Sequence, residues 1–307
     1  MSATIVITGA TSGFGRTALA TIAEHHTGPV VVGARDVSSV PVSFGDHVRA
    51  VRLDLESLTS VRQFCDEVGD GPICALAMNA GITSNKMRMT EDGFDRTFQV
   101  NYLGHFLMFQ LLESRLTNDA IVLTTGSGTH DPDEKAPPPA PRHASVPWLA
   151  FPDRDPYRDR LGPRAAARAY TASKLCCILL AREIANRYPN LRSVSFDPGF
   201  LPETNLSREF PKLVAALVKR IVPHTMPKDR TGTVATTAPV FARLVLGTEP
   251  VSRNGAYIAM RDGRGVHVEP STLALRPGVG ETLWIDSMEL LSNPAGDELG
   301  CVAQPGV

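Results

Sequence analysis

Two side chains of this sequence, Tyr170 and Lys174, stand four residues apart and could move a proton together. On a helix this spacing places both side chains on the same face. Tyrosine has an ordinary pKa of about 10 and is a poor acid at neutral pH. An ammonium about 4 Å away would stabilise the phenolate by at most about 4 kcal/mol at an effective dielectric constant of 20, enough to lower the pKa by about two to three. The pair therefore predicts a general acid, although the same spacing also occurs by chance on exposed helices.

A glycine-rich turn follows the first apolar run of the chain, Thr4–Thr8, and leads directly into a helical pattern. Its glycines allow tight turns and a close approach of the backbone to a ligand, and the helix that follows offers unpaired N–H groups to a pyrophosphate. A strand before the turn and a helix after it are the context that this motif requires. The turn predicts a dinucleotide site formed by Gly9, Thr11, Ser12, Gly13, Phe14 and Gly15.

The second apolar run, Val30–Gly33, is followed by Arg35 and Asp36. Dinucleotide-binding folds place the residue that reads the adenosine ribose about 20 residues beyond the glycine turn. An arginine at this place would bind a 2′-phosphate through two hydrogen bonds, whereas an acid would bind the ribose hydroxyls and repel the phosphate. We therefore expect NADPH/NADP+ as the cofactor rather than NADH. In the alternative, Arg35 is a solvated surface charge and Asp36 binds the ribose.

These residues need elements that hold them at one edge of a sheet, and the apolar pattern supplies such elements. Short β-branched runs alternate with helix-length segments, which is typical of a parallel sheet covered on both faces. We expect one domain, residues 1–307, with a doubly wound α/β Rossmann fold of about seven parallel strands. The expected strands are Thr4–Thr8, Val30–Gly33, Val48–Leu53, Ile73–Met78, Ala120–Thr125, Arg192–Asp197 and Ala256–Met260. The expected helices are Gly15–His25, Ser57–Val68, Glu91–Leu116 (bent or in two parts), Ala169–Arg187, Leu206–Ile221, Thr231–Leu246 and Gly280–Leu291.

Two segments interrupt this alternation. Residues 130–168 are rich in proline, with Pro137, Pro138 and Pro139 in a row, which predicts an irregular insertion with a short helix near Ala165. It is either a tolerated insertion or a lid over the site. Residues 199–230 are expected to form a substrate-loop region.

The composition excludes several classes of protein. Hydrophobic residues make up 43% and charged residues 21%, and the formal net charge is −1, so the chain is not expected to be disordered or to bind nucleic acid. It shows no apolar run long enough for a membrane span and no export signal, so a cytoplasmic location is expected. The five cysteines form no CxxC pair and the histidines show no metal-ligand spacing, so no metal site is expected.

Further motifs occur in a characteristic order along the chain. They are the Thr8–Gly15 turn, Asn79-Ala80-Gly81, Asn101, Ser127, the Tyr170–Lys174 pair and Pro198-Gly199. In these motifs the sequence resembles the short-chain dehydrogenase/reductase family from Ala3 to about Leu291. The Gly126–His130 segment and Leu283-Trp284 are most similar to the retinol dehydrogenase and light-dependent protochlorophyllide reductase branch.

The resemblance implies a role for each matching residue. Tyr170 would be the general acid/base, Lys174 would bind the nicotinamide ribose, Ser127 would hold the substrate oxygen, and Asn101 would anchor a water that relays protons. The cofactor would also contact Asp54, Leu55, Asn79, Ala80, Gly81, Pro198, Gly199 and Thr204. Relatives in this family often pair through the helices that here carry Phe106 and Leu179, so a homodimer, a tetramer and a monomer all stay open.

The substrate is expected to be a bulky, largely apolar carbonyl compound or alcohol. Phe200, Leu201, Phe210 and Trp148 would line its pocket. Protochlorophyllide reductases carry a cysteine where this chain has Phe200, which favours a carbonyl over the pigment as substrate. The expected function is therefore NADPH-dependent hydride transfer at a carbonyl or alcohol carbon. Reduction of a conjugated C=C bond and a non-catalytic dinucleotide sensor are the alternatives.

Overall fold

The computed structural model describes residues 2–160, 162–203 and 228–293, built around one eight-stranded sheet. The strands lie in the order β3-β2-β1-β4-β5-β6-β7-β8, and every neighbouring pair is parallel except β7 with β8. Their bounds are β1 Thr4–Thr8, β2 Val30–Ala34, β3 Val48–Arg52, β4 Ile73–Met78, β5 Leu116–Thr125, β6 Arg192–Asp197, β7 Ala256–Arg261 and β8 Arg264–His267. The predicted doubly wound α/β class is confirmed, with eight strands in place of about seven.

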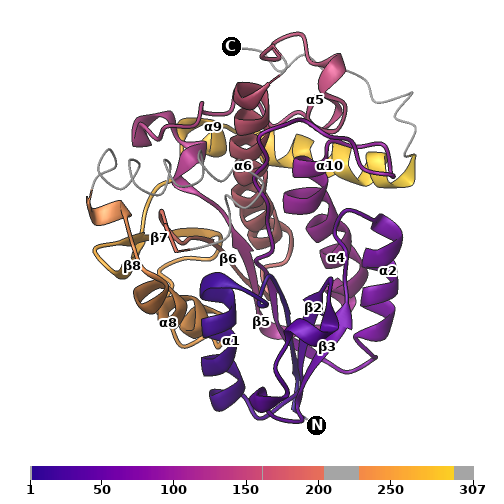
Figure 1. Cartoon of the computed structure of the whole chain (residues 1–307), viewed down its shortest axis with the longest axis vertical. Helices are drawn as coiled ribbons and strands as arrows, with labels where there is room; N and C mark the ends of the chain where they lie inside the picture. The colour runs from indigo at the N-terminus through magenta and orange to yellow at the C-terminus, as the bar shows by residue number, and fades with distance from the viewer. Residues whose placement is uncertain (1, 161, 204–227, 294–307) are drawn as a thin grey trace.

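Helices cover both faces of this sheet (Figure 1). Helices α1 and α8 pack together on one face, whereas α2, α4 and α6 lie on the other, with α10 against α6. The α-helices of the described residues are α1 Gly13–His25, α2 Leu58–Glu67, α3 Arg96–Phe98, α4 Gly104–Leu112, α5 Val146–Ala150, α6 Pro163–Arg187, α8 Val234–Val245, α9 Thr272–Leu275 and α10 Val279–Ser292. Between α3 and α4 the chain makes a π-helical turn, Gln99–Leu103.

The continuous apolar strands follow from burial on both faces. All five residues of β1 are buried, and successive side chains enter different cores. Val6 belongs to the core under α2, α4 and α6, whereas Ile5 and Ile7 belong to the core under α1 and α8. Polar residues that could act in catalysis or binding are therefore expected at the ends of the strands.

The strand order reverses direction at β1, which lies between β2 and β4. In doubly wound folds the ligand crevice opens at the carboxyl ends of the strands beside this reversal. The glycine turn follows β1 and Asn79 follows β4, so both lie at this edge of the sheet.

Some elements differ from those predicted. Strand β8 was not predicted, because its side chains are largely exposed and form no apolar run. Its hairpin does carry a signal, since Asp262 and Gly263 have φ values of 48° and 75° and Asp-Gly favours such tight turns. Helix α6 begins at Pro163, so the short helix expected near Ala165 is its first turn and the irregular insertion ends before that proline. The predicted helix 206–221 lies outside the described residues.

Helix α10 covers the face formed by α4 and α6. The ring of Trp284 packs edge-on against that of Phe106, with centroids 5.0 Å apart, and Tyr102 and Ser287 share a hydrogen bond of 2.8 Å. Phe106 and Leu179 are both buried. These two side chains are therefore packed within this chain.

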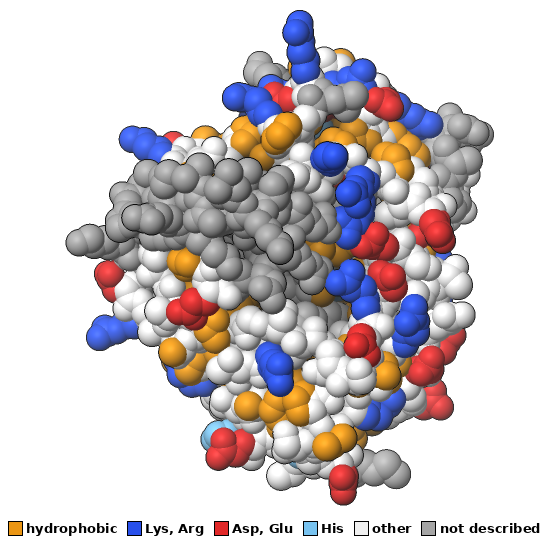
Figure 2. Space-filling view, viewed as in Figure 1, with side chains coloured by type: hydrophobic (Ala, Val, Ile, Leu, Met, Phe, Trp, Pro, Cys, Tyr) orange, Lys and Arg blue, Asp and Glu red, His pale blue; other side chains and the backbone are white. Residues whose placement is uncertain are grey.

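On the visible face, the described residues form no patch of a single sign of charge (Figure 2). Lysine and arginine side chains lie beside aspartate and glutamate side chains over the part of this face that is coloured by residue type. Within residues 2–160, 162–203 and 228–293, no helix is both long and apolar enough to span a membrane.

Candidate active site

The glycine turn packs against the end of β4 with no room for side chains at two of its glycines. Gly9 has φ of 69°, and a β-carbon there would lie 2.7 Å from both the Ala80 nitrogen and Asn79 Nδ2. A β-carbon on Gly15 would lie 2.3 Å from the Gly9 carbonyl oxygen. The backbone itself therefore forms this wall, and it leads into the N-terminus of α1, where Ser12 makes no side-chain cap.

Thr8 and Asn79 tie the three central strands together. The Thr8 hydroxyl accepts hydrogen bonds from the backbone nitrogens of Asn79 (2.9 Å) and Ala80 (3.0 Å). Asn79 Nδ2 donates to the Gly9 carbonyl (3.1 Å), and Asn79 Oδ1 accepts from the Thr125 hydroxyl (3.0 Å). These bonds fix the carboxyl ends of β1, β4 and β5 against one another.

One pocket of about 570 Å³ runs along this edge of the sheet. Its lining includes all the predicted cofactor residues that the structure describes, namely Gly9, Thr11, Ser12, Gly13, Phe14, Gly15, Arg35, Asp54, Leu55, Asn79, Ala80, Gly81, Tyr170, Lys174, Pro198 and Gly199. Thr204 lies outside the described residues. Ser127 lines the same pocket.

At the end of β2, Arg35 and Asp36 have different surroundings. The Arg35 side chain is 52% exposed, lines the pocket and lies 4.0 Å from Glu56. The Asp36 carboxylate accepts hydrogen bonds from the backbone nitrogen (3.0 Å) and hydroxyl (2.7 Å) of Ser38 and does not line the pocket. Of these two neighbours, Arg35 is therefore the one that reaches the pocket, where Asp54 and Glu56 line the same end.

Tyr170 and Lys174 project from α6 into the pocket and are both buried. Lys174 Nζ donates to the Thr125 carbonyl (2.8 Å) and lies 5.9 Å from the centre of the Tyr170 ring. The pKa of Tyr170 is raised, whereas the neighbouring ammonium was expected to lower it. Burial raises the pKa of Tyr170 and the charge of Asp197 adds to this rise, while the Ser127 hydrogen bond acts in the opposite direction. Burial lowers the pKa of Lys174.

Asn101 lies behind Gly81 on the π-helical turn, a feature frequent at functional sites. Its Oδ1 accepts from the Ile82 nitrogen (2.8 Å), and its Nδ2 donates to Ser173 Oγ (2.9 Å) and to the Ile82 carbonyl (3.0 Å). A β-carbon on Gly81 would lie 3.3 Å from Asn101 Oδ1 and 3.4 Å from Lys174 Nζ. Asn101 thus fixes the backbone after Gly81, beside Lys174.

Two histidines near the site were missed by the sequence reasoning. His130 Nδ1 lies 2.7 Å from the Ser127 carbonyl, and the Ser271 nitrogen donates to His130 Nε2 (3.0 Å). Burial lowers the pKa of His130, so the neutral ring carries its proton on Nδ1 and donates it to that carbonyl. His105 bridges the Thr8 hydroxyl (3.0 Å) and the Asn101 carbonyl (3.1 Å), and burial lowers its pKa to about 4. Both rings therefore support residues of the site in neutral form.

Asp197, at the end of β6, was also missed. It lines the pocket, and Oδ1 accepts from the Gly199 nitrogen (2.9 Å). Oδ2 accepts from the Gly128 nitrogen (2.9 Å) and from the Tyr257 hydroxyl (3.0 Å). A polar residue that ends an apolar strand just before Pro198-Gly199 was a signal that could have revealed it.

The predicted substrate residues divide into three groups. Phe200 and Leu201 line the pocket. Trp148 does not, so that prediction is wrong: its ring packs edge-on against His143 (5.0 Å) and Tyr157 (5.7 Å) inside the insertion. Phe210 lies outside the described residues.

Comparison with known proteins agrees with this geometry. The short chain dehydrogenase profile matches residues 3–130. Over 209 residues, 64% of this chain and 65% of the relative, the sequence is 34% identical to a Streptomyces sp. (strain C5) protein named daunorubicin C-13 ketoreductase. Over 237 residues, 70% of this chain and 59% of the relative, it is 31% identical to the chloroplastic protochlorophyllide reductase of Chlamydomonas reinhardtii. The chain thus spans less than two thirds of the length of these two curated relatives.

Solved structures with the same fold are also known. The crystal structure of an uncharacterised Mycobacterium paratuberculosis protein superimposes with a TM-score of 0.69 at 26% identity, covering 94% of this chain and 93% of that one. Profile, relatives and fold agree with the order of motifs along the pocket. The chain belongs to the short-chain dehydrogenase/reductase family of NAD(P)-dependent oxidoreductases.

Proposed function

We propose that this protein is an NADPH-dependent reductase of bulky, largely apolar carbonyl compounds, formed by residues 1–307 as one nucleotide-binding domain. The observation that carries the proposal is that Ser127, Tyr170 and Lys174 line the same pocket as the glycine turn. A proton donor, a hydrogen-bond donor and a cation thus adjoin a nucleotide-sized crevice. A sensor without chemistry would need only the crevice.

The residues of the crevice fit a dinucleotide. The turn at Gly9 and Gly15 leaves no room for β-carbons, so main-chain N–H groups and the start of α1 are free to meet a pyrophosphate. When bound, the reduced nicotinamide supplies a hydride to the substrate. Lys174 would hold the nicotinamide ribose, and Asn79 to Gly81 would flank the cofactor.

Tyr170 would donate the proton and Ser127 would hold the carbonyl oxygen. As negative charge develops on that oxygen, two preorganised hydroxyl groups stabilise it. Because burial raises the pKa of Tyr170, the residue stays a phenol at neutral pH. The protonated form is the one that ketone reduction requires.

The substrate part of the pocket supports an apolar ligand. Phe200, Leu201 and Pro202 line it, and Pro137 and Pro138 of the insertion line it as well. The charged residues of this lining, Glu134, Arg230 and Arg261, pair with one another. The Streptomyces relative is named as a ketoreductase, which supports a ketone. The relative named protochlorophyllide reductase supports reduction of a C=C bond as the second candidate function. Incubation with NADPH and an α,β-unsaturated aryl ketone separates the two, because an allylic alcohol supports the first and a saturated ketone the second.

Replacing Arg35 with alanine should weaken NADPH binding by roughly 10- to 100-fold, since a hydrogen bond to a charged group contributes about 1.5–3 kcal/mol. NADH has no 2′-phosphate, so its dissociation constant should change by less than about threefold. Fluorescence titration of the purified variant with both nucleotides measures the two effects. Asp36→Ala is the matched control, because Asp36 is bonded to Ser38 and should leave the preference unchanged. Equal losses for NADPH and NADH in Arg35→Ala would refute the proposed role of Arg35.

Replacing Asp197 with asparagine should lower the pKa of Tyr170, because the Asp197 charge opposes ionisation of the phenol. A unit charge about 10 Å away at an effective dielectric constant of about 20 changes a pKa by roughly one. Alcohol oxidation requires the phenolate, so its kcat/KM near pH 8 should rise roughly tenfold. Tyr257→Phe removes one hydrogen bond to Asp197 but no charge, and its pH profile should keep its position. An unshifted profile in Asp197→Asn would contradict this electrostatic role.

A further inference from the structure

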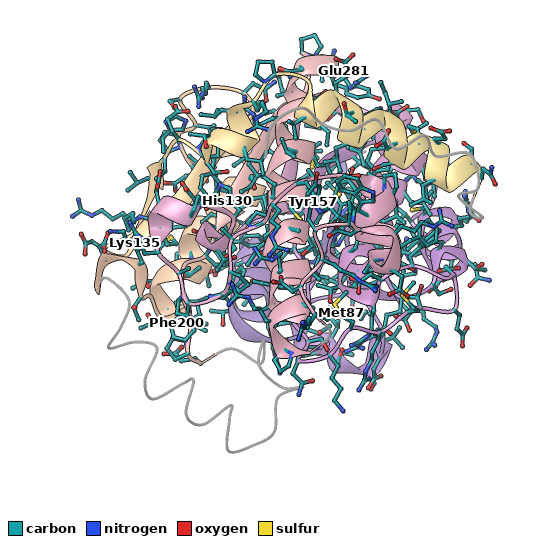
Figure 3. The ribbon with its side chains drawn as sticks, turned by 90° about the horizontal axis from the view of Figure 1, so that it is seen from above. Met87, His130, Lys135, Tyr157, Phe200 and Glu281 are labelled. Carbon is teal, nitrogen blue, oxygen red and sulfur yellow. The ribbon has the colours of Figure 1, made fainter. Side chains whose placement is uncertain are left out.

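Residues Glu134–Ala140, here called the proline strap, cross the substrate part of the pocket. Glu134, Ala136, Pro137 and Pro138 line the pocket, as do Phe200 and Leu201. Seen from above, Lys135 and Phe200 lie on the same side of α6 (Figure 3). The strap and the residues after Gly199 therefore both border the space in which a substrate would sit.

One end of the strap is held by a compact ion cluster. Glu134 Oε1 accepts from Arg261 Nη2 (2.9 Å), and Oε2 lies 2.5 Å from Arg230 Nη1. Arg230 Nη1 also donates to the Glu134 carbonyl (2.8 Å). The Glu134 side chain is only 15% exposed. Arg230 in turn accepts a backbone bond from Phe200 (2.9 Å), so the same residue connects the strap to the opposite part of the lining.

The other end is held by the helix that carries Tyr170. The Thr171 hydroxyl donates to the Pro139 carbonyl (2.7 Å), and Arg168 Nη1 donates to the Ala140 carbonyl. Arg168 also pairs with Asp159. The strap is therefore tied directly to the first turns of α6, beside the proposed proton donor.

Between these ends the chain has little freedom. Each proline fixes φ near −65° and offers no N–H group, so the three consecutive prolines form a stiff segment without backbone donors. A stiff segment anchored at both ends is already ordered before a ligand binds, which lowers the entropic cost of binding. The absence of donors at the prolines disfavours polar groups on the part of a ligand that packs against them.

We infer that the proline strap is the specificity-determining wall of this site, and that it selects ketones with a flat, apolar ring beside the carbonyl group. The ring packs on Pro137 and Pro138, and the ion cluster at Glu134 holds the wall in place. This inference rests on the proposed function. It goes beyond it by assigning ring selection to a segment of the insertion and by making Glu134 a positioning residue.

The test compares 2-acetylnaphthalene with butan-2-one as substrates in the full-length protein. In the double variant Pro137→Gly/Pro138→Gly and in Glu134→Gln, the KM for 2-acetylnaphthalene should rise about tenfold, equivalent to about 1.4 kcal/mol. Its kcat should change less than about threefold, and kcat/KM for butan-2-one should stay within about twofold. Asp133→Asn, an exposed carboxylate next to Glu134, is the matched control and should change neither substrate.

A binding measurement keeps the test independent of turnover and of folding. Calorimetric titration of 2-acetylnaphthalene into the protein saturated with NADP+ should show the same tenfold weakening, while the nucleotide dissociation constant stays unchanged. If a variant loses nucleotide binding, Thr171→Val replaces it, because that change removes the hydroxyl bonds to the Pro139 and Arg168 carbonyls and leaves the ion cluster at Glu134 intact. If wild type binds the naphthyl ketone but reduces neither ketone, the proposed function fails and the titration still decides on the strap. An unchanged ratio of the two substrates, or no binding of the naphthyl ketone to wild type, would overturn the inference.

Discussion

Tyr170→Phe should lower kcat by roughly 10²- to 10⁴-fold, the range typical of losing a positioned general acid. The phenol is buried in the pocket with Ser127 and Lys174, and phenylalanine fills the same space without a proton to donate. NADPH binding should stay within about twofold of wild type, because the ring and the Lys174 bond to Thr125 are retained. Steady-state kinetics with an aromatic ketone and a fluorescence titration with NADPH measure the two properties.

The matched control for this variant is Tyr157→Phe. Tyr157 is partly exposed and packs against Trp148 in the insertion, away from the pocket lining, so its variant should keep wild-type kcat. Wild-type turnover in Tyr170→Phe would show that another group donates the proton. Loss of NADPH binding along with turnover would place Tyr170 in cofactor binding rather than in proton transfer.

Ser127→Ala should lower kcat by roughly 10²- to 10³-fold, as expected when one preorganised donor to a developing oxyanion is removed. The Ser127 hydroxyl also lowers the pKa of Tyr170, so its loss should raise that pKa further and slow alcohol oxidation more than ketone reduction. Kinetics in both directions across a range of pH measure this difference.

Thr129→Val is the control for the serine variant. The Thr129 hydroxyl donates to Ser127 Oγ (3.1 Å), so this change removes a neighbour of the serine but leaves its hydroxyl in place. Thr129→Val should therefore keep kcat within about threefold of wild type. Equal losses in the two variants would indicate that loop geometry, and not the Ser127 hydroxyl, determines the rate.

The sheet was predictable because most of its strands are buried on both faces. Ile73–Met78 was predicted with the bounds that the structure shows, since a buried parallel strand reads as an unbroken apolar run. The beginning of β5 at Leu116 was missed, because its first residues, Thr117 to Asp119, are polar. Exposed β8 was missed for the same physical reason: apolar patterning reports burial, and these residues are not buried.

The location of the candidate site was also predictable, whereas its electrostatics were not. Ser127 and Pro198-Gly199 follow strands, so parallel topology brings them to one edge without any knowledge of side-chain contacts. The pKa of Tyr170 depends on how deeply the phenol is buried and on where the Lys174 ammonium points, and spacing along a helix determines neither. Trp148 could not be placed either, because an irregular insertion has no periodicity to orient its side chains.

The central claim is that this pocket delivers a hydride from NADPH to a carbonyl carbon. The most direct test is to incubate the wild-type protein with NADPH deuterated at C4 of the nicotinamide and an α,β-unsaturated aryl ketone, and to locate the label in the product by NMR. We predict an alcohol that carries one deuterium on its carbinol carbon, and no such product from Tyr170→Phe. Deuterium on a former C=C carbon, or no deuterium in any product across aromatic and polycyclic ketones, would contradict the claim.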